Sequence, residues 1–254
     1  MSWLLLHDGP APGAWNMALD EALLEAASAG QRTLRLYAWN PPAISFGRHE
    51  PALRRYDRDA IHARGLAAVR RPTGGRAVWH HRELTYSVAA PSGTFGTLQD
   101  TYHEIHAMLA DALAALGAPV ALAAARAAAP VGAGACFASP AGGEVVTDTG
   151  RKLVGSAQVR SGAAFLQHGS VLLAAEQDVV ADVTRGDAAA PAEAGLRSLI
   201  GAGATWAAVA DAVSLAAARR WKSPAHPGAL PQSVRDRAES LRPHYADDDW
   251  TWRH

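Results

Sequence analysis

The sequence predicts an α+β fold in which mixed, largely antiparallel sheets are flanked by helices. Segments with strand-like and hairpin-like patterns cluster in the middle of the chain, and segments with helical periodicity occupy both ends. Grouped strands beside grouped helices are typical of the α+β class. No internal repeat and no linker-like stretch divides the 254 residues, so we expect a single domain over 1–254.

Helical periodicity marks the two ends and one central segment. Near the N-terminus, residues 16–27 place Leu19 and Leu23 on one helical face, and Gly30 lies beyond the end. The other expected helices are residues 98–116 with Gly117 as the stop, a helix reaching residue 221 with Thr205 as its N-cap, and a shorter helix over 232–241.

Short apolar segments between these helices predict strands. Residues 33–38 alternate apolar and polar side chains, as a half-buried strand does. Further strands are expected at residues 44–47, 67–70, 77–79, 84–89, 163–167 and 170–173. Residues 144–147 and 152–158 are expected to form a β-hairpin around residues 148–150. Residues 119–125 fit either a strand or a helix.

The composition is that of a globular protein with balanced charges. Hydrophobic residues make up 49%, and 24 Lys and Arg stand against 24 Asp and Glu. A nucleic-acid-binding protein would more often be basic, so we expect no nucleic-acid partner. The single cysteine allows no intramolecular disulfide and fits a reducing cytoplasm. The first residues do not have the pattern of a signal peptide, and no apolar run reaches membrane-span length, so we expect no membrane partner.

A turn rich in glycine is the first candidate for a binding site. Gly74 and Gly75 follow a proline, and a backbone without Cβ atoms lets a ligand approach closely. Arg71 and Arg76 flank the turn and could bind a carboxylate or phosphate. An ordinary turn with surface arginines explains the pattern equally well, because the Lys-Ser/Thr ending of a P-loop is missing.

Polar residues also interrupt two predicted strands. Lys152 follows a turn and enters a strand of small residues, where it could point into a pocket, although a solvated hairpin lysine is the commoner outcome. Gln167, His168 and Ser170 lie among apolar residues, where they could line a site or be hydrogen-bonded core groups.

Cysteine and histidine patterns alone give little support for special chemistry. Cys136 ends a small-residue loop over 131–136, but a lone cysteine is usually a small buried hydrophobe. The pair His80 and His81 completes no ligand set, and adjacent strand residues point to opposite faces. We therefore expect no metal site.

Taken together, five stretches resemble the biotin/lipoate protein ligase superfamily. They are 16–24 (NMALDEALL), 36–47 (LYAWNPPAISFG), 70–88 (RRPTGGRAVWHHRELTYSV), 150–173 (GRKLVGSAQVRSGAAFLQHGSVLL) and 245–253 (YADDDWTWR). The third and fourth stretches are specific only in combination. The resemblance covers nearly the whole chain and implies the catalytic-domain fold of that superfamily.

Within the superfamily, residues 132–158 resemble the octanoyl-[acyl-carrier-protein]:protein N-octanoyltransferase branch. In that branch a nucleophilic cysteine precedes a lysine, and Cys136 and Lys152 match these two positions. The resemblance implies that octanoyl-acyl carrier protein is the donor and that a lysine of a lipoyl domain, such as the glycine cleavage H protein, is the acceptor. It further implies no cofactor and a monomer.

The resemblance also implies a set of substrate-contacting residues. They are Arg71, Gly74, Gly75, Arg76, Val78, His80, Gly155, Ser156, Ala157, Gln167, His168 and Gly169. Gly155, Ser156 and the turn at 74–75 are candidates for stabilising an oxyanion. The floor of an acyl slot, or equally plain core, is expected at Val78, Trp79, Leu84 and Val154.

Three alternatives stay open on the sequence. An amidotransferase that moves octanoyl or lipoyl groups between lipoyl domains would carry a similar cysteine. An ATP-dependent lipoate ligase would need no cysteine, so Cys136 would be incidental. A protein that only binds acylated carriers would need neither Cys136 nor Lys152.

Overall fold

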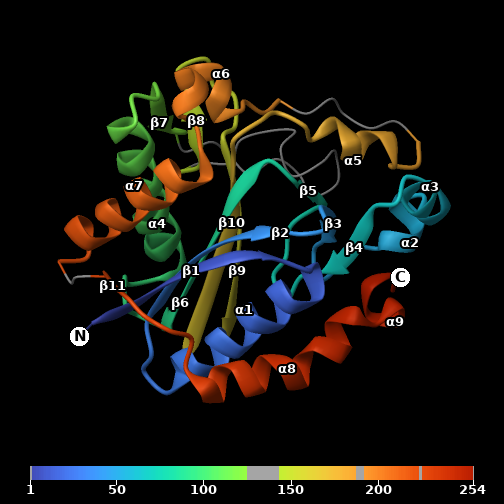
Figure 1. Cartoon of the computed structure of the whole chain (residues 1–254), viewed down its shortest axis with the longest axis horizontal. Helices are drawn as coiled ribbons and strands as arrows, with labels where there is room; N and C mark the ends of the chain where they lie inside the picture. Colours follow the sequence, from blue (N-terminus) through green and yellow to red (C-terminus); the bar gives the residue numbers. More distant parts are fainter. Residues whose placement is uncertain (1, 125–142, 187–191, 223–224, 254) are drawn as a thin grey trace.

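The computed structural model describes residues 2–124, 143–186, 192–222 and 225–253. Its centre is a six-stranded sheet with the strand order β11-β1-β2-β6-β10-β9 (Figure 1). The strands are β11 (Ala225–Pro227), β1 (Trp3–Ala11), β2 (Thr33–Trp39), β6 (Glu83–Pro91), β10 (Ala164–Leu172) and β9 (Val154–Ser161). Strand β1 runs parallel to β11 and β2, and the other three pairings are antiparallel.

Two smaller sheets lie beside the main one. The three-stranded sheet has the order β4 (Ala67–Arg70), β3 (Ala43–Phe46), β5 (Val78–His80) and mixes one parallel with one antiparallel pairing. The two-stranded sheet pairs β7 (Val120–Leu122) with β8 (Val145–Thr147) in antiparallel fashion. The expected α+β class with mixed, largely antiparallel sheets is therefore confirmed.

Helices cover both faces of the main sheet. On one face α4 (Leu98–Ala115) packs with α7 (Trp206–Arg220), and on the other α1 (Gly13–Ser28) packs with α8 (Gln232–Ala246) (Figure 1). The shorter helices are α2 (Ala52–Arg55), α3 (Arg58–Ala63), α5 (Asp178–Asp182), α6 (Leu196–Ile200), the 3-10 turn Gly201–Gly203 and α9 (Asp248–Thr251).

Local sequence explains where these helices begin. Thr97 and Asp100 form a reciprocal capping box at the start of α4. Thr205 accepts a hydrogen bond from the amide of Ala208, which confirms it as the N-cap of α7.

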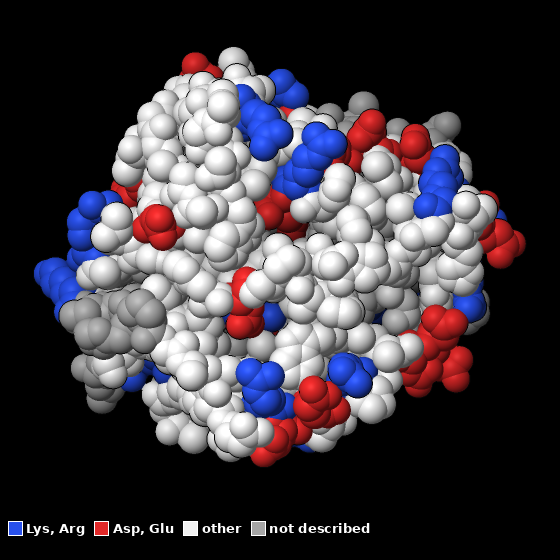
Figure 2. All heavy atoms as spheres, viewed as in Figure 1, with Lys and Arg blue, Asp and Glu red and all other residues white. Residues whose placement is uncertain are grey.

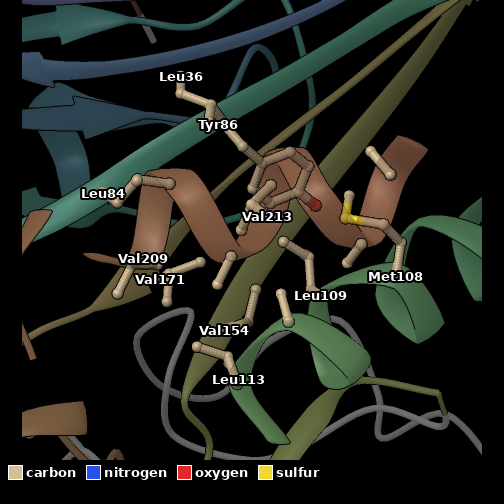
Figure 3. Packing of buried hydrophobic residues seen from close by; sticks show 14 of the residues in the cluster. Leu36, Leu84, Tyr86, Met108, Leu109, Leu113, Val154, Val171, Val209 and Val213 are labelled. Carbon is tan, nitrogen blue, oxygen red and sulfur yellow. The ribbon is translucent and has the colours of Figure 1, made fainter. Parts of the chain in front are cut away.

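The α4/α7 face of the main sheet carries the largest hydrophobic core. Leu84, Tyr86 and Val88 of β6 contribute to it, together with Leu109 of α4 and Val213 of α7 (Figure 3). Successive strand residues point to opposite faces. The residues between them on β6 therefore face α1, where polar side chains gather.

Among the differences from the sequence prediction, which include the unpredicted short helices, four have a clear local reason. The unpredicted strand β1 occupies the apolar start of the chain, with pairing on both of its edges. Residues 144–158 do turn back on themselves, but pairing ends at Leu153 because β9 then joins β10. The two strands expected over 163–173 are one, and Gly169 sits so close to β9 that a Cβ would lie 2.3 Å from the Gly155 carbonyl. Helix α8 runs past Pro243 to Ala246, where buried Tyr245 donates a hydrogen bond to Glu21 on α1.

No individual helix in the described part is long and apolar enough to cross a membrane. One sharply bent pair, Leu196–Gly203 with Trp206–Arg220, meets the length and composition criterion.

Candidate active site

A narrow cavity opens between the main sheet, α1 and the three-stranded sheet. Its walls are Met17, Tyr37, Trp39, Arg71, Val78, His80, Thr85, Gly155, Ser156, Ala157, His168, Gly169 and Ser170. Ser156 and Ala157 on β9 are partly exposed and mark the mouth. Met17, Tyr37 and Trp39 are buried and close the inner end. The cavity is thus a largely apolar slot with one open end.

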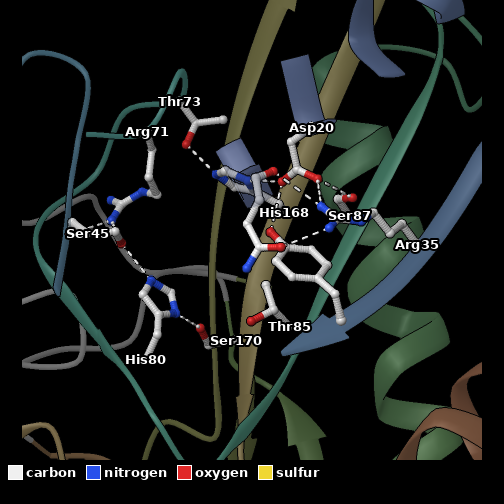
Figure 4. Close-up of polar contacts among 12 residues, drawn as sticks. Asp20, Arg35, Ser45, Arg71, Thr73, His80, Thr85, Ser87, His168 and Ser170 are labelled. Carbon is white, nitrogen blue, oxygen red and sulfur yellow. Dashed lines mark hydrogen bonds and ion pairs between the residues drawn. The ribbon is translucent and has the colours of Figure 1, made fainter. Parts of the chain in front are cut away.

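Asp20 organises the polar groups on the α1 face of the sheet (Figure 4). Its carboxylate accepts hydrogen bonds from Arg35 at 2.9 Å, Tyr37 at 2.8 Å and Ser87 at 2.9 Å, and is 2.9 Å from Nδ1 of His168. Burial alone would raise the pKa of Asp20, but the hydrogen bond from His168 and the charge of Arg35 lower it below its usual value. Asp20 is therefore an ionised, fully buried anchor.

This anchor fixes the orientation of His168 at the cavity wall. Burial lowers the pKa of His168, so its ring is neutral, and the Asp20 carboxylate holds the proton on Nδ1. Nε2 is then an acceptor for the hydroxyl of Thr73, 2.6 Å away. The glycine turn that follows Thr73 is thereby tied to the main sheet.

Arg71 shapes the same turn from inside. Its guanidinium donates to the carbonyl of Ser45 at 2.7 Å, to that of Gly74 at 3.2 Å and to that of Arg76 at 2.8 Å. Gly75 has φ +89, and a Cβ there would lie 3.3 Å from Nη2 of Arg71. These bonds direct Arg71 largely to protein carbonyls, so its main part at the site is to hold the backbone of the turn.

His80 forms the opposite wall of the cavity. Its Nδ1 is 2.8 Å from Glu83, its Nε2 is 2.6 Å from the hydroxyl of Ser45, and its ring stacks on Trp39 at a centroid distance of 4.0 Å. Trp39 in turn donates from Nε1 to Thr85 at 2.7 Å. Trp39 is therefore fixed at the inner end of the slot on both its face and its edge.

Lys152 lies just before β9 and is not among the residues that line the cavity. Its ammonium donates to Glu144 at 2.7 Å, and both side chains are buried. The charge of Lys152 is felt by His106 of α4, whose Nε2 is 2.8 Å from the Ser156 hydroxyl. Lys152 is thus close to the hydrogen-bonded pair of His106 and Ser156 on the α4 face of the sheet. Cys136 lies outside the described residues.

The structure brings most of the expected substrate-contacting residues to this cavity. Eight line it, namely Arg71, Val78, His80, Gly155, Ser156, Ala157, His168 and Gly169. Gly74, Gly75 and Arg76 form the turn that Arg71 holds. Gln167 points to the other face of β10 and donates to Tyr86 at 3.0 Å.

Of the four residues considered for the floor of the slot, only Val78 lines the cavity. Trp79 packs in the cluster around the three-stranded sheet, and Leu84 and Val154 pack in the large core. The sequence reasoning missed the lining residues Met17, Tyr37, Trp39 and Thr85. Met17, Tyr37 and Thr85 lie in predicted elements, and Trp39 directly follows the predicted strand 33–38, where alternation could have grouped it with Tyr37.

Metal binding finds no support within the part of the chain that the structure describes. No group of three or more His, Cys, Asp and Glu side chains is placed there to hold an ion.

Comparison with known proteins places this site in a family. Residues 12–213 match the Lipoyl protein ligase A/B catalytic domain, and the chain belongs to this family. It is 39% identical over 273 aligned positions to octanoyltransferase LipM of Kyrpidia tusciae, covering 99% of each chain. It is 38% identical to octanoyltransferase LipM of Symbiobacterium thermophilum, covering 99% of this chain and 98% of the relative. A crystal structure of lipoate-protein ligase A bound with ATP superimposes with a TM-score of 0.84 at 19% identity over 99% of each chain, which shows the shared fold.

Proposed function

We propose that the protein transfers an octanoyl group to a lysine of a lipoyl domain in lipoate biosynthesis. The observation that carries this proposal is the end-to-end similarity to octanoyltransferases, at 39% identity. The apolar slot, open at β9 and closed by Trp39 and Tyr37, supports it. An apolar slot favours the binding of a short acyl chain, because each buried methylene contributes about 0.8 kcal/mol.

The proposed reaction has two half-reactions. The Cys136 thiolate attacks the thioester carbonyl of the donor, and the carrier's phosphopantetheine thiolate leaves and takes up a proton. The neutral amine of the acceptor lysine then attacks the enzyme thioester, an amide forms, and the Cys136 thiolate leaves. Exchanging one thioester for another is nearly balanced in energy, and amide formation drives the second step, so no ATP is consumed.

Lys152 has two tasks in this proposal. An ammonium near a cysteine favours the thiolate, which is the nucleophile. The same residue exchanges a proton with the amine in the second half-reaction. The buried bond to Glu144 supports these tasks, because it fixes the direction of the ammonium.

The proposed partners are octanoyl-acyl carrier protein as donor and a lipoyl domain, such as the glycine cleavage H protein, as acceptor. Acidic and basic side chains are interspersed on the face in Figure 2, so any basic docking region for an acidic partner is local. Arg76, at the turn beside the cavity, is a candidate for such a region. We also propose that the chain works as a single domain, as a monomer and in the cytoplasm.

The test is an acyl-transfer assay with purified protein and no nucleotide. Octanoyl-acyl carrier protein and an apo lipoyl domain are mixed with the enzyme, and acceptor mass is followed. We expect acylation without ATP. Strict dependence on ATP would instead support a ligase. Acylation only from an octanoylated lipoyl domain, and not from the carrier protein, would support an amidotransferase.

A further inference from the structure

Two side chains restrain Trp39 at the inner end of the cavity. The ring of His80, on β5, stacks on the indole at a centroid distance of 4.0 Å and an interplanar angle of 15°. The hydroxyl of Thr85, on β6, accepts a hydrogen bond from the indole Nε1 at 2.7 Å. His80 therefore holds the face of the ring, and Thr85 holds its edge.

Both restraining residues are bonded to a single oxygen of Glu83. Nδ1 of His80 is 2.8 Å from Oε1 of Glu83, and the hydroxyl of Thr85 donates to the same atom. The indole N–H of Trp39 can only donate, so the Thr85 oxygen accepts it and the single Thr85 proton goes to Glu83. Oε1 is thus an acceptor, and Nδ1 of His80 directs its proton toward it. One atom of Glu83 fixes both residues that hold Trp39.

The local sequence places Glu83 within reach of both partners. Glu83 and Thr85 are two residues apart on β6, so their side chains lie on the same face of the strand, the one toward α1. Only residues 81 and 82 separate the end of β5 at His80 from the start of β6. Glu83 is buried and is not among the residues that line the cavity, so it can influence a bound chain only through its neighbours.

The second oxygen of Glu83 argues that the residue does more than stabilise the fold. Oε2 is buried and has no hydrogen-bond partner within the described part of the chain. A buried acceptor without a partner destabilises the folded state, so an apolar side chain of similar shape would serve folding as well. What the carboxyl group adds is the shared acceptor for His80 and Thr85.

We propose that Glu83 is the positioning residue that sets the depth of the slot and, with it, the length of acyl chain that the enzyme accepts. It acts by holding His80 and Thr85, which in turn keep the indole of Trp39 across the inner end. A restrained ring rejects a longer chain by steric clash, whereas a ring that can turn aside admits it. This inference rests on the proposed function, in which the slot receives the octanoyl chain.

The test is a competition between octanoyl- and decanoyl-acyl carrier protein, carried out with the full-length protein. Both donors compete for an apo lipoyl domain, and intact mass gives the ratio of decanoyl to octanoyl product. Glu83→Leu removes both hydrogen bonds, and we expect this ratio to rise about fourfold over wild type, the value of one additional buried methylene. Glu83→Gln keeps an acceptor oxygen for His80 and Thr85, so its ratio should stay within about twofold of wild type.

Two further variants separate this role from a general loss of stability. Leu109→Ala leaves a cavity in the core on the other face of the sheet, and its product ratio should equal that of wild type. Thr85→Val keeps the shape of the side chain but breaks the link between Trp39 and Glu83, so its ratio should rise even if Glu83→Leu does not fold.

A double variant shows whether Glu83 acts through Trp39. In Trp39→Leu the indole is already absent, so adding Glu83→Leu should change the product ratio by less than about twofold. Effects that multiply in the double variant would mean that Glu83 shapes the slot by another route, and would overturn the inference.

The remaining outcomes separate this inference from the proposed function. A wild-type ratio in both Glu83→Leu and Thr85→Val would overturn the inference and leave octanoyl transfer intact. An equal rise in Leu109→Ala and Glu83→Leu would trace the effect to lost stability and would overturn it too. If the wild-type protein transfers neither acyl group, the proposed function fails, and this inference fails with it.

Discussion

The two faces of the six-stranded sheet each bury a neutral histidine, but they hold it differently. On the α1 face, a carboxylate holds the Nδ1 proton of His168, and that carboxylate also pairs with buried Arg35. On the α4 face, a backbone carbonyl holds the Nδ1 proton of His106 at the edge of the large apolar core, where burial and the nearby charge of Lys152 lower the pKa of this histidine. The first face lines the cavity around a closed, charged hydrogen-bond network, whereas the second carries the largest apolar core. Stability and chemistry should therefore respond differently to mutation on the two faces.

The largest effect on folding is expected on the charged face. Asp20→Ala removes the central acceptor of Arg35, Tyr37 and His168, and breaking a buried ion pair costs about 3–5 kcal/mol of unfolding free energy. Denaturant unfolding measures it. Glu25→Ala is the matched control, since Glu25 pairs with Arg237 on the surface, where such pairs contribute about 0–1 kcal/mol. Equal losses of unfolding free energy in Asp20→Ala and Glu25→Ala would show that the buried network stabilises the fold no more than a surface ion pair.

On the α4 face, a substitution that leaves a cavity in the core should lower the free energy of unfolding without changing the rate of acyl transfer. Leu109 is fully buried between α4 and the sheet, so Leu109→Ala is expected to cost about 2–5 kcal/mol. Transfer per folded molecule should stay near the wild-type rate below the unfolding transition. A selective loss of transfer in Leu109→Ala would show that this face of the sheet also shapes the site.

The pH dependence of the unfolding free energy tests whether His106 is neutral in the folded protein. The pKa of His106 is about 3 in the folded protein, below the usual value of 6.5, so the unfolded chain binds its proton first as pH falls. The contribution is complete above pH 6.5 and is lost as pH falls toward 3, at up to about 1.4 kcal/mol per pH unit. His106→Leu should flatten the slope between pH 4 and 6.5 by about one proton. An unchanged slope would mean that His106 is protonated in the fold.

The smallest effect concerns the length of the acyl chain. Trp39 closes the slot, held by stacking on His80 and by its bond to Thr85. Trp39→Leu should open room for about two methylenes, which at about 0.8 kcal/mol each favours decanoyl over octanoyl by roughly tenfold relative to wild type. Competition between the two carrier-bound chains measures the ratio. Val179→Ala, in the separate cluster around the three-stranded sheet, is the control and should leave the ratio unchanged.

The sequence could predict the four long helices, α1, α4, α7 and α8, and most strands, because their periodicity and caps act locally. It did not predict β1, because the few apolar residues of this segment form a strand only through pairing with two neighbouring strands, β11 and β2. At the site, the motifs drew attention to His168 and Ser156, but Met17 and Trp39 are apolar residues whose role depends on what faces them. His106 left one trace, a polar residue beside Ile105 on the buried side of α4.

The central claim is tested most directly by the mass of the enzyme after exposure to octanoyl-acyl carrier protein without nucleotide. We expect that the wild-type chain gains one octanoyl group on Cys136, that hydroxylamine removes it, and that Cys136→Ala gains none and transfers none. A Cys136→Ala protein that acylates the lipoyl domain at the wild-type rate would contradict it.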